Sequence, residues 1–183
     1  DRETAAVPRI SAGMGMTAMP FTRPERAQCP VDFTGFDCGE QQINDWLKHH
    51  ANASNKNGSA ALYLSYDHET NELAGVYTLS STTVARDETY APWMRRNSPI
   101  LVPAALLGQL AVANHFQHRG LAKALIRDAV DRTLQLSLTI GIRALVVDPL
   151  NSNLTMFYDS LGFEGFNGET RMYFRMPNYP RTL

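Results

Sequence analysis

Residues 117–122 form the part of the chain best suited to hold a phosphate group. They read Gln117-x-x-Gly120-x-Ala122 and stand between an apolar strand and a long helix expected from the sequence. Small residues at such a turn let backbone N–H groups approach a ligand, and the helix N-terminus favours negative charge. Arg119 and Lys123 could add positive charge. The pattern is neither a Walker A loop nor a Gly-x-Gly-x-x-Gly dinucleotide site, so it indicates a pyrophosphate cradle or a plain structural turn.

A second stretch offers a group that could move a proton. It begins at Asn151 and contains the aromatic pair Phe157-Tyr158, followed by Gly162-Phe163. The phenol of Tyr158, with an ordinary pKa of ~10, is protonated at neutral pH and could donate that proton. Phe157 is better explained as a core residue of a helix, and the same structural explanation is available for Tyr158.

Hydrophobic periodicity defines the elements that must position both stretches. The order of elements is helix, hairpin, strand, helix, strand, helix and strand, which predicts a single α/β domain with a mixed central sheet flanked by helices. The expected helices are residues 37–51, 122–138 and 151–161, and the expected strands are residues 60–66, 73–80, 106–112, 143–147 and 170–176.

Local patterns refine the first helix and the connections. Asp37 and Glu40 have the spacing of a capping box and are expected to begin that helix. The polar, Asn-rich residues 52–58 are expected to form a loop, and the long connection 86–99 is of a length that often carries function.

The N-terminal part is punctuated by proline, methionine and glycine. We expect residues 1–30 to be an extension ahead of a domain at residues 31–183. Met14 and Met16 could be natural starts, so part of the extension could be foreign to the natural chain. No charged segment followed by an apolar one marks a secretion signal.

Composition excludes several classes of protein. The chain has 183 residues, 44% of them hydrophobic, with a net charge of −1, which excludes a wholly disordered chain. No apolar run approaches the ~20 residues of a membrane helix. The histidines lack Cys or carboxylate partners at ligand spacing, so no metal site is expected. Cys29 and Cys38 could form one disulfide, but two cysteines are no disulfide scaffold, and a reduced, cytoplasmic protein is expected.

Together, the two stretches resemble the GNAT superfamily, whose members transfer an acetyl group from acetyl-CoA to an amine. The resemblance spans about residues 31–176. It implies that the turn takes the CoA pyrophosphate, that the strand before it hydrogen-bonds the pantetheine, and that the later Asn and Phe-Tyr helix flank the thiol. The cofactor-binding residues that it implies are Leu110, Ala111, Val112, Gln117, His118, Arg119, Gly120, Leu121, Ala122, Asn151 and Phe157.

A larger set of motifs resembles one subgroup of this superfamily. Phe36-Asp37-Cys38-Gly39 before the first helix, residues 75–80, residues 107–112 and the Phe-Tyr helix look like the GNAT toxins of bacterial toxin–antitoxin pairs. That resemblance implies acetylation of the α-amino group of aminoacyl-tRNA, which blocks translation. It also implies an antitoxin partner with a ribbon-helix-helix domain, and a homodimer is common among such toxins.

Contact with tRNA would need a local basic patch, because the net charge is not that of a general polyanion binder. Basic residues exceed acidic ones between residues 86 and 127, and most are arginines, which suit phosphate contacts. A solvated basic stretch is the competing explanation. Trp93 could stack on a base or pack beneath its own loop. The candidate tRNA-binding residues are Arg86, Arg95, Arg96 and Lys123.

Proton arithmetic favours an α-amine acceptor. Roughly a quarter of an α-amine with a pKa of ~7.7–8.0 is neutral near pH 7.4, against ~0.1% of a lysine. Residues 106–112 carry no acid, and the turn after them offers only His115 and His118 as bases. We therefore predict direct transfer, with Tyr158 as general acid and the Val112 N–H polarising the thioester carbonyl, while His115 is a candidate relay. A GNAT enzyme for a small amine or a protein N-terminus, and a non-catalytic CoA-binding module, are the alternatives.

Overall fold

Two long antiparallel strands, β3 and β4, form the spine of the molecule, and five shorter strands complete the sheet in the order β1-β2-β3-β4-β5-β7-β6. The computed structural model describes residues 19–88, 91–166 and 170–177. The strands are β1 (Glu25–Arg26), β2 (Ala61–Tyr66), β3 (Leu73–Ala85), β4 (Leu101–Val112), β5 (Ala144–Val147), β6 (Glu164–Gly165) and β7 (Met172–Arg175). The helical segments are α1 (Gln41–Trp46), η1 (Leu47–Ala51), α2 (Asn52–Asn57), η2 (Arg86–Glu88), α3 (Pro92–Arg95), η3 (Asn114–Phe116), α4 (Leu121–Ser137) and α5 (Ser152–Ser160).

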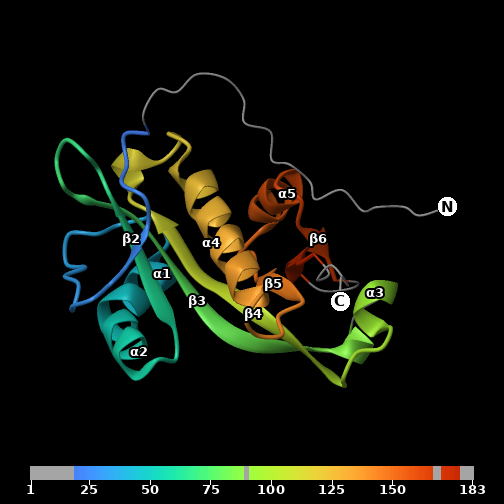
Figure 1. The fold of residues 1–183 in the computed structure, drawn as a ribbon. Helices are drawn as coiled ribbons and strands as arrows, with labels where there is room; N and C mark the ends of the chain where they lie inside the picture. Colours follow the sequence, from blue (N-terminus) through green and yellow to red (C-terminus); the bar gives the residue numbers. More distant parts are fainter. Residues whose placement is uncertain (1–18, 89–90, 167–169, 178–183) are drawn as a thin grey trace.

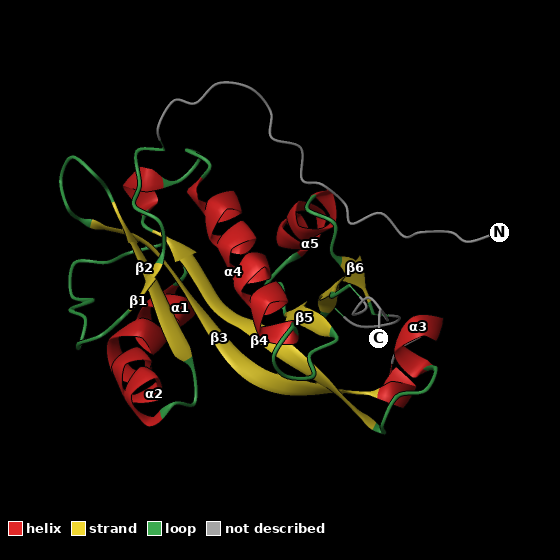
Figure 2. Cartoon of the chain, viewed as in Figure 1, coloured by secondary structure: helices red, strands yellow, loops and turns green. Residues whose placement is uncertain are grey.

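The predicted α/β domain with a mixed sheet is confirmed. All strand pairs are antiparallel except β4 with β5, which are parallel and joined by the crossover helix α4. Figure 1 shows α4 in front of the sheet and α1 behind it, and Figure 2 shows the same helices in red against the yellow strands. Helices on both faces explain why the short β5 reads as a continuous apolar run, since all of its residues are buried.

The helix α4 approaches the sheet closely because β3 has a glycine beneath it. A Cβ on Gly75 would lie 2.9 Å from side-chain atoms of both Leu121 and Leu125. Leu121 and Leu125 belong to the apolar face predicted for this helix, and both are buried. The first turn of α4 is therefore held at a fixed height above the sheet.

The spine is longer than the sequence indicated. Pairing between β3 and β4 continues to Ala85 opposite Leu101, whereas the predicted strands were residues 73–80 and 106–112. A second hydrophobic cluster at this end contains Val84 and Val102 and supplies the burial that the extra pairing needs.

Residues 52–58 are not the loop that their composition predicted. A continuous helical stretch runs through α1, the π-helical turn η1 and α2, and ends at Gly58 with a φ of 78°. Its asparagines make tertiary hydrogen bonds: the Asn52 amide bonds Val31 N–H and C=O at 2.8 and 2.9 Å. These bonds offset the low helix propensity of asparagine.

The predicted capping box is also wrong. Glu40 is the N-cap residue of α1 and makes no side-chain cap, while Asp37 Oδ1 accepts from Gly39 N–H at 2.8 Å and from Asn44 Nδ2 at 2.7 Å. The Gly39 bond is the largest cause that lowers the pKa of Asp37, followed by the Asn44 bond. Asp37 thus shapes the loop before the helix instead of its first turn.

Part of the expected N-terminal extension packs on the domain. Phe21 is buried, and Glu25–Arg26 pair with β2 as an edge strand. Residues 1–18, with both internal methionines, lie outside the described residues, so the boundary at residue 31 stays a prediction.

Candidate acetyl-transfer cleft

The central feature is a cleft where β4 and β5 part. The two strands pair only between Ala105–Leu107 and Leu145–Val147, and the rest of β4 within the described residues pairs with β3 alone. Figure 1 shows β4 running on past the short β5 toward the start of α4. The cavity there has a volume of about 270 Å³. Its walls are Gln42 and Ile43 of α1, residues 106–110, residues 147–150, Leu154 and Tyr158.

A β-bulge lies at the mouth of this cleft. The register between β3 and β4 shifts between Tyr77 and Leu79, so β4 carries one extra residue there. The buried Thr78 supplies the missing acceptor: its Oγ1 accepts the Gln109 N–H at 2.9 Å. A Cβ on Gly108 would stand 2.7 Å from that oxygen. Because bulges bend and twist the strand that carries them, this one accounts for the divergence of β4 from β5.

The open edge of β4 presents main-chain groups to the cleft. Ala113 N–H bonds Ala74 C=O, and in an antiparallel pair alternate residues direct their main-chain groups to opposite sides. The N–H groups of Leu110 and Val112 therefore face away from β3. Ala111 and Val112 have buried side chains, while the Leu110 side chain lines the cavity. This geometry suits hydrogen bonding to an extended amide-bearing ligand.

The turn before α4 has the geometry of an anion cradle. His118 and Gly120 have φ angles of 61° and 84°, and α4 begins directly after them without a side-chain cap. A Cβ on Gly120 would meet nothing within 4 Å, so the space outside the turn is open. Uncapped N–H groups at a helix N-terminus bind phosphate. Arg119 is exposed beside them, whereas the Leu121 side chain is buried, so only its amide and that of Ala122 are available.

Gln117 braces this turn from behind. Its Nε2 donates to the main-chain oxygens of Cys38 and Val112 at 2.9 and 3.0 Å. These bonds tie the cradle to the loop before α1 and to the end of β4. The side chain thus has a bracing role in the structure, and its contact with a cofactor stays a prediction.

Tyr158 presents its hydroxyl to the cleft. Its side chain is 4% exposed and its ring packs edge-on against Phe163 at 5.2 Å. The hydroxyl makes no hydrogen bond within the described residues, and none of their buried side-chain oxygens lacks a partner. The oxygen therefore opens into the cavity that the residue lines. Burial raises the pKa of Tyr158 above its usual value, which keeps the phenol protonated at neutral pH.

Phe157 and Asn151, which were predicted to flank the thiol, stabilise the helix α5. Phe157 is half-buried, 6.0 Å from the Tyr158 ring, and is not among the residues that line the cavity. Asn151 is exposed and its Oδ1 accepts the Leu154 N–H at 3.0 Å, which caps α5. Both residues thereby fix the helix that carries Tyr158.

The cavity lining contains few titratable groups. Asp148 and Tyr158 are its only ones among the described residues, and the Asp148 carboxylate is engaged by Arg171 at 2.7 and 3.0 Å. His115 lies on η3, exposed and 3.1 Å from Glu72, and does not line the cavity. A cluster of three His, Cys, Asp or Glu residues that could hold a metal is not found in the described part of the chain. None of its helices is long and apolar enough to span a bilayer.

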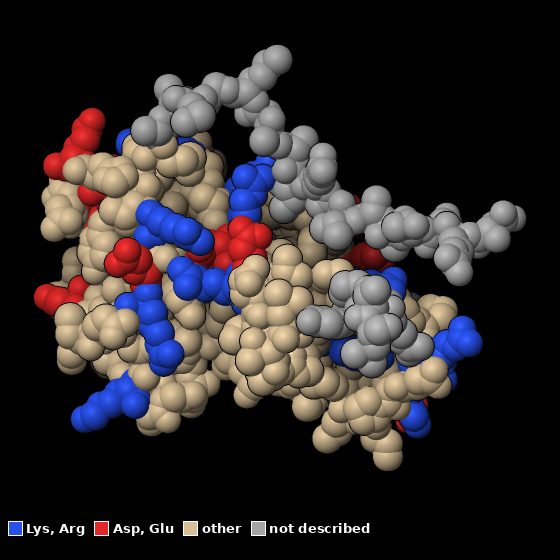
Figure 3. Space-filling model, in the orientation of Figure 1, with Lys and Arg blue, Asp and Glu red and all other residues tan. Residues whose placement is uncertain are grey.

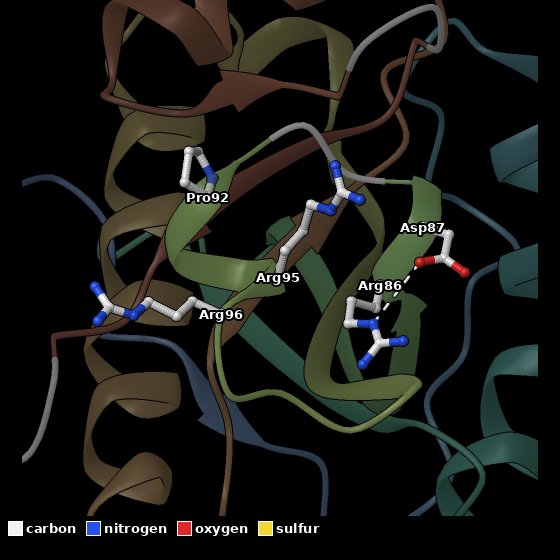
Figure 4. A pocket seen from close by; sticks show the side chains of 5 residues that line it. All are labelled: Arg86, Asp87, Pro92, Arg95 and Arg96. Atoms are coloured by element: carbon white, nitrogen blue, oxygen red, sulfur yellow. Dashed lines mark ion pairs between the residues drawn. The ribbon is translucent and has the colours of Figure 1, made fainter.

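The predicted tRNA-binding residues fall into two places. Arg86, Arg95 and Arg96 line a hollow of about 500 Å³ beside α3, and Figure 3 shows basic atoms at this end of the molecule. In Figure 4 the three guanidinium groups point in different directions, and Arg86 is paired with Asp87 at 3.7 Å. Lys123 stands in the first turn of α4, beyond the opposite end of the 12-residue β4 and roughly 35 Å away by strand length.

Sequence reasoning missed several residues of the site. Gln42 and Ile43 come from α1, far from β4 in sequence, and Thr78 comes from the neighbouring strand. A polar residue inside an otherwise apolar strand was the only sign of Thr78 in the sequence. Nothing in the local pattern of α1 distinguishes residues that face the cleft from residues that face the core.

The structure thus offers an open main-chain edge on β4, an uncapped helix terminus after it and a phenol that opens into the cleft. Residues 34–163 match the Acetyltransferase (GNAT) family, and the chain belongs to that family. It is an acetyl-CoA-dependent N-acetyltransferase, with acetyl-CoA as its co-substrate.

The chain is similar to several individual proteins of this family. The chain is 35% identical over 145 residues to a tRNA-acetylating toxin of Mycobacterium tuberculosis (strain ATCC 25618 / H37Rv), covering 79% of this chain and 85% of the relative. It is similar to AtaT complexed with acetyl-methionyl-tRNAfMet, with a TM-score of 0.77 and 27% identity over 85% of this chain and 94% of the other. A mutant AtaT toxin bound to the C-terminus of the antitoxin AtaR and acetyl-CoA gives a TM-score of 0.70 and 27% identity, over 85% and 93%.

Proposed function

We propose that this acetyltransferase is a toxin that acetylates the α-amino group of aminoacyl-tRNA and so blocks translation. The observation that carries the proposal is the cleft in which the Tyr158 hydroxyl opens beside the free edge of β4, in a chain 35% identical to a tRNA-acetylating toxin. Acetylation removes the nucleophilic lone pair of the α-amine, so the blocked aminoacyl-tRNA cannot accept a growing peptide.

Different parts of the site would bind different parts of acetyl-CoA. The amides at the start of α4 hold the pyrophosphate, and the edge groups of Leu110 hold a pantetheine amide. Acetyl-CoA supplies the activated acetyl group. The Val112 N–H lies on the edge from which it can polarise a carbonyl oxygen, as donors in an oxyanion hole do.

Tyr158 serves as the general acid. As the amine nitrogen bonds to the acetyl carbon and the carbon–sulfur bond breaks, the phenol gives its proton to the leaving sulfur. It regains a proton from the amine nitrogen, directly or through water, so that an amide and a free thiol are the products. The raised pKa of Tyr158 keeps it protonated and ready before each turnover.

The proton balance of the cleft supports an α-amine acceptor. The Asp148 carboxylate, paired with Arg171, is the only acid that lines the cavity in the described residues. A lysine acceptor would need a strong base, whereas an α-amine with a pKa of ~7.7–8.0 supplies a neutral fraction by itself. Arg95 at the end of α3 and Arg96 after it offer exposed charges for the phosphates of the nucleic acid.

Charged tRNA and labelled acetyl-CoA test the proposal directly. We expect N-acetyl-aminoacyl-tRNA with the wild-type chain, and a loss of about 100-fold or more in kcat with Tyr158→Phe while the Kd for acetyl-CoA is unchanged. Absence of product with every charged tRNA, together with acetylation of a small amine or a peptide N-terminus, would replace the proposed acceptor. Full activity of Tyr158→Phe would remove the assignment of the acid.

The proposal includes partners. AtaT has been captured with the C-terminus of an antitoxin, and we propose an antitoxin with a ribbon-helix-helix domain for this chain. We also propose that the chain forms a homodimer, which light scattering would detect. We propose that it acts in the cytoplasm, where charged tRNA and acetyl-CoA are found. Co-expression with a short neighbouring open reading frame should relieve growth arrest if that frame encodes the antitoxin.

A further inference from the structure

Arg143 directly precedes β5 and bonds the segment 93–98, which contains most of α3, to the sheet. Its Nη2 donates to the main-chain oxygen of Trp93 at 2.7 Å, and its Nη1 donates to Ser98 Oγ. One planar fork therefore bonds both ends of the segment 93–98. Its Cζ also lies 5.4 Å from the centre of the Trp93 ring. Trp93 packs beneath its loop, which is one of the two roles the sequence left open.

The ring of Trp93 is held from other sides as well. Arg175 Cζ lies 4.7 Å from its centre and the Tyr173 ring lies at 5.7 Å, both on β7. Arg143 is half-buried and also makes hydrogen bonds to the segment, whereas Arg175 is exposed. Arg175 therefore provides a comparison in which the charge is similar and the hydrogen-bonding fork is absent.

The segment held in this way has little stability of its own. The helix α3 has four residues, and helices this short do not persist alone in water. Met94 is fully buried in the second hydrophobic cluster. Arg95 and Arg96 are exposed, and their side chains make no hydrogen bond or ion pair within the described residues. The positions of these two guanidinium groups follow from the backbone that Arg143 and Met94 fix.

We propose that Arg143 is a positioning residue for the nucleic-acid substrate, acting through Arg95 and Arg96. It holds α3 so that the two exposed guanidinium groups meet phosphates of the nucleic acid without the entropic cost of first ordering the segment. The inference rests on the proposed function, because it assumes that the phosphates belong to tRNA. Lysine cannot replace arginine here, because one ammonium group lacks the planar fork that reaches Trp93 and Ser98 together.

The test compares Arg143→Met with Arg143→Lys and with the matched control Arg175→Met. We expect Arg143→Met and Arg143→Lys to raise the KM for aminoacyl-tRNA about 10-fold with kcat and the Kd for acetyl-CoA unchanged, which is the pattern of lost substrate binding. Arg175→Met should change KM less than 3-fold. Full rescue by Arg143→Lys, or an equal effect of Arg175→Met, would show that charge and not the fork matters and would overturn the proposal.

A double-mutant cycle tests whether Arg143 acts through the exposed arginines. In the Arg95→Ala/Arg96→Ala background, Arg143→Met should raise KM less than 2-fold further. The same 10-fold effect in that background would refute the proposed route. Ser98→Ala, which removes only one partner of the fork, should shift KM in the same direction by a smaller factor and covers the case in which Arg143→Met does not fold.

Hydrogen exchange separates this inference from the proposed function. Amides of residues 93–98 should exchange at least 10-fold faster in Arg143→Met than in the wild-type chain, while amides of α4 keep their protection. Unchanged exchange at residues 93–98 would overturn the anchor itself. If residues 93–98 exchange faster in Arg143→Met but the wild-type chain acetylates no tRNA, the anchor is confirmed. The proposed function, and with it the role of Arg143 in positioning tRNA, is then refuted.

Discussion

Thr78→Val isolates the acceptor that completes the bulge of β4. Valine has nearly the shape of threonine, so packing around this 3%-exposed side chain is kept while the oxygen is lost. The Gln109 N–H then loses its partner at 2.9 Å. Leaving a part-buried N–H without a partner costs up to about 1–3 kcal/mol, or roughly 5- to 150-fold in an equilibrium constant. We expect the unfolding free energy to fall by about 2 kcal/mol.

The same change should also alter the cleft. Without the acceptor, residues 108–110 lose the contact that holds the bulge, and the edge groups of Leu110 and Val112 move from their positions. We expect the KM for acetyl-CoA to rise about 10-fold, which corresponds to about 1.4 kcal/mol. Thiol release gives the kinetics, calorimetry gives the Kd for acetyl-CoA, and urea unfolding gives the stability.

Two variants control this experiment. Thr78→Ser keeps the hydroxyl and should return the KM to within 2-fold of wild type. Thr133→Val removes another fully buried hydroxyl, but that group donates to Ala129 C=O within its own helix, so its loss leaves no buried N–H unpaired. The reasoning is refuted if Thr78→Val keeps both the wild-type KM and the wild-type stability, or if Thr133→Val has the same effects.

Two further predictions concern the amine and the Asn-rich helix. The kcat/KM for aminoacyl-tRNA should rise as the neutral fraction of an α-amine grows from ~2% at pH 6 to ~60% at pH 8. Because burial raises the pKa of Tyr158, the pH profile of kcat/KM should stay flat up to pH 9.5. A fall in kcat/KM below pH 9 would show that a group other than Tyr158 donates the proton to the leaving sulfur. Asn55→Ala removes bonds to Ala27 C=O at 2.9 Å and Leu62 N–H at 3.1 Å and should cost about 1–2 kcal/mol after the gain in helix propensity. We expect its Tm to fall by about 5 °C, whereas the exposed Lys56→Ala should leave it unchanged, and equal values for both variants would contradict a tertiary role of Asn55.

Sequence patterns located two elements of the candidate site. The turn at residues 117–122 lies directly before α4, and Tyr158 lies on α5 and lines the cleft. Both are local features, because the turn needs small residues next to a helix N-terminus and the helix follows from its own periodicity. The same local patterns predicted the order of elements along the chain, and from it a mixed sheet.

Other features depend on contacts between segments far apart in the chain. Helix α2 exists because Asn52 and Asn55 bond to residues of the N-terminal segment and β2, which no local propensity reports. Gln117 has a bracing role because its amide meets carbonyls from two other elements.

The chain's own sequence determined which groups are present: a small-residue turn that suits a pyrophosphate, a phenol that can donate a proton, and arginines that suit phosphate contacts. Only the tertiary structure decided where those groups lie. Thr78 on β3 sets the bulge at which β4 parts from β5, and Arg143 beside β5 sets the position of α3. The reason is that both depend on hydrogen bonds between strands and loops that meet only when the sheet has formed, whereas periodicity and turn chemistry act within a few residues.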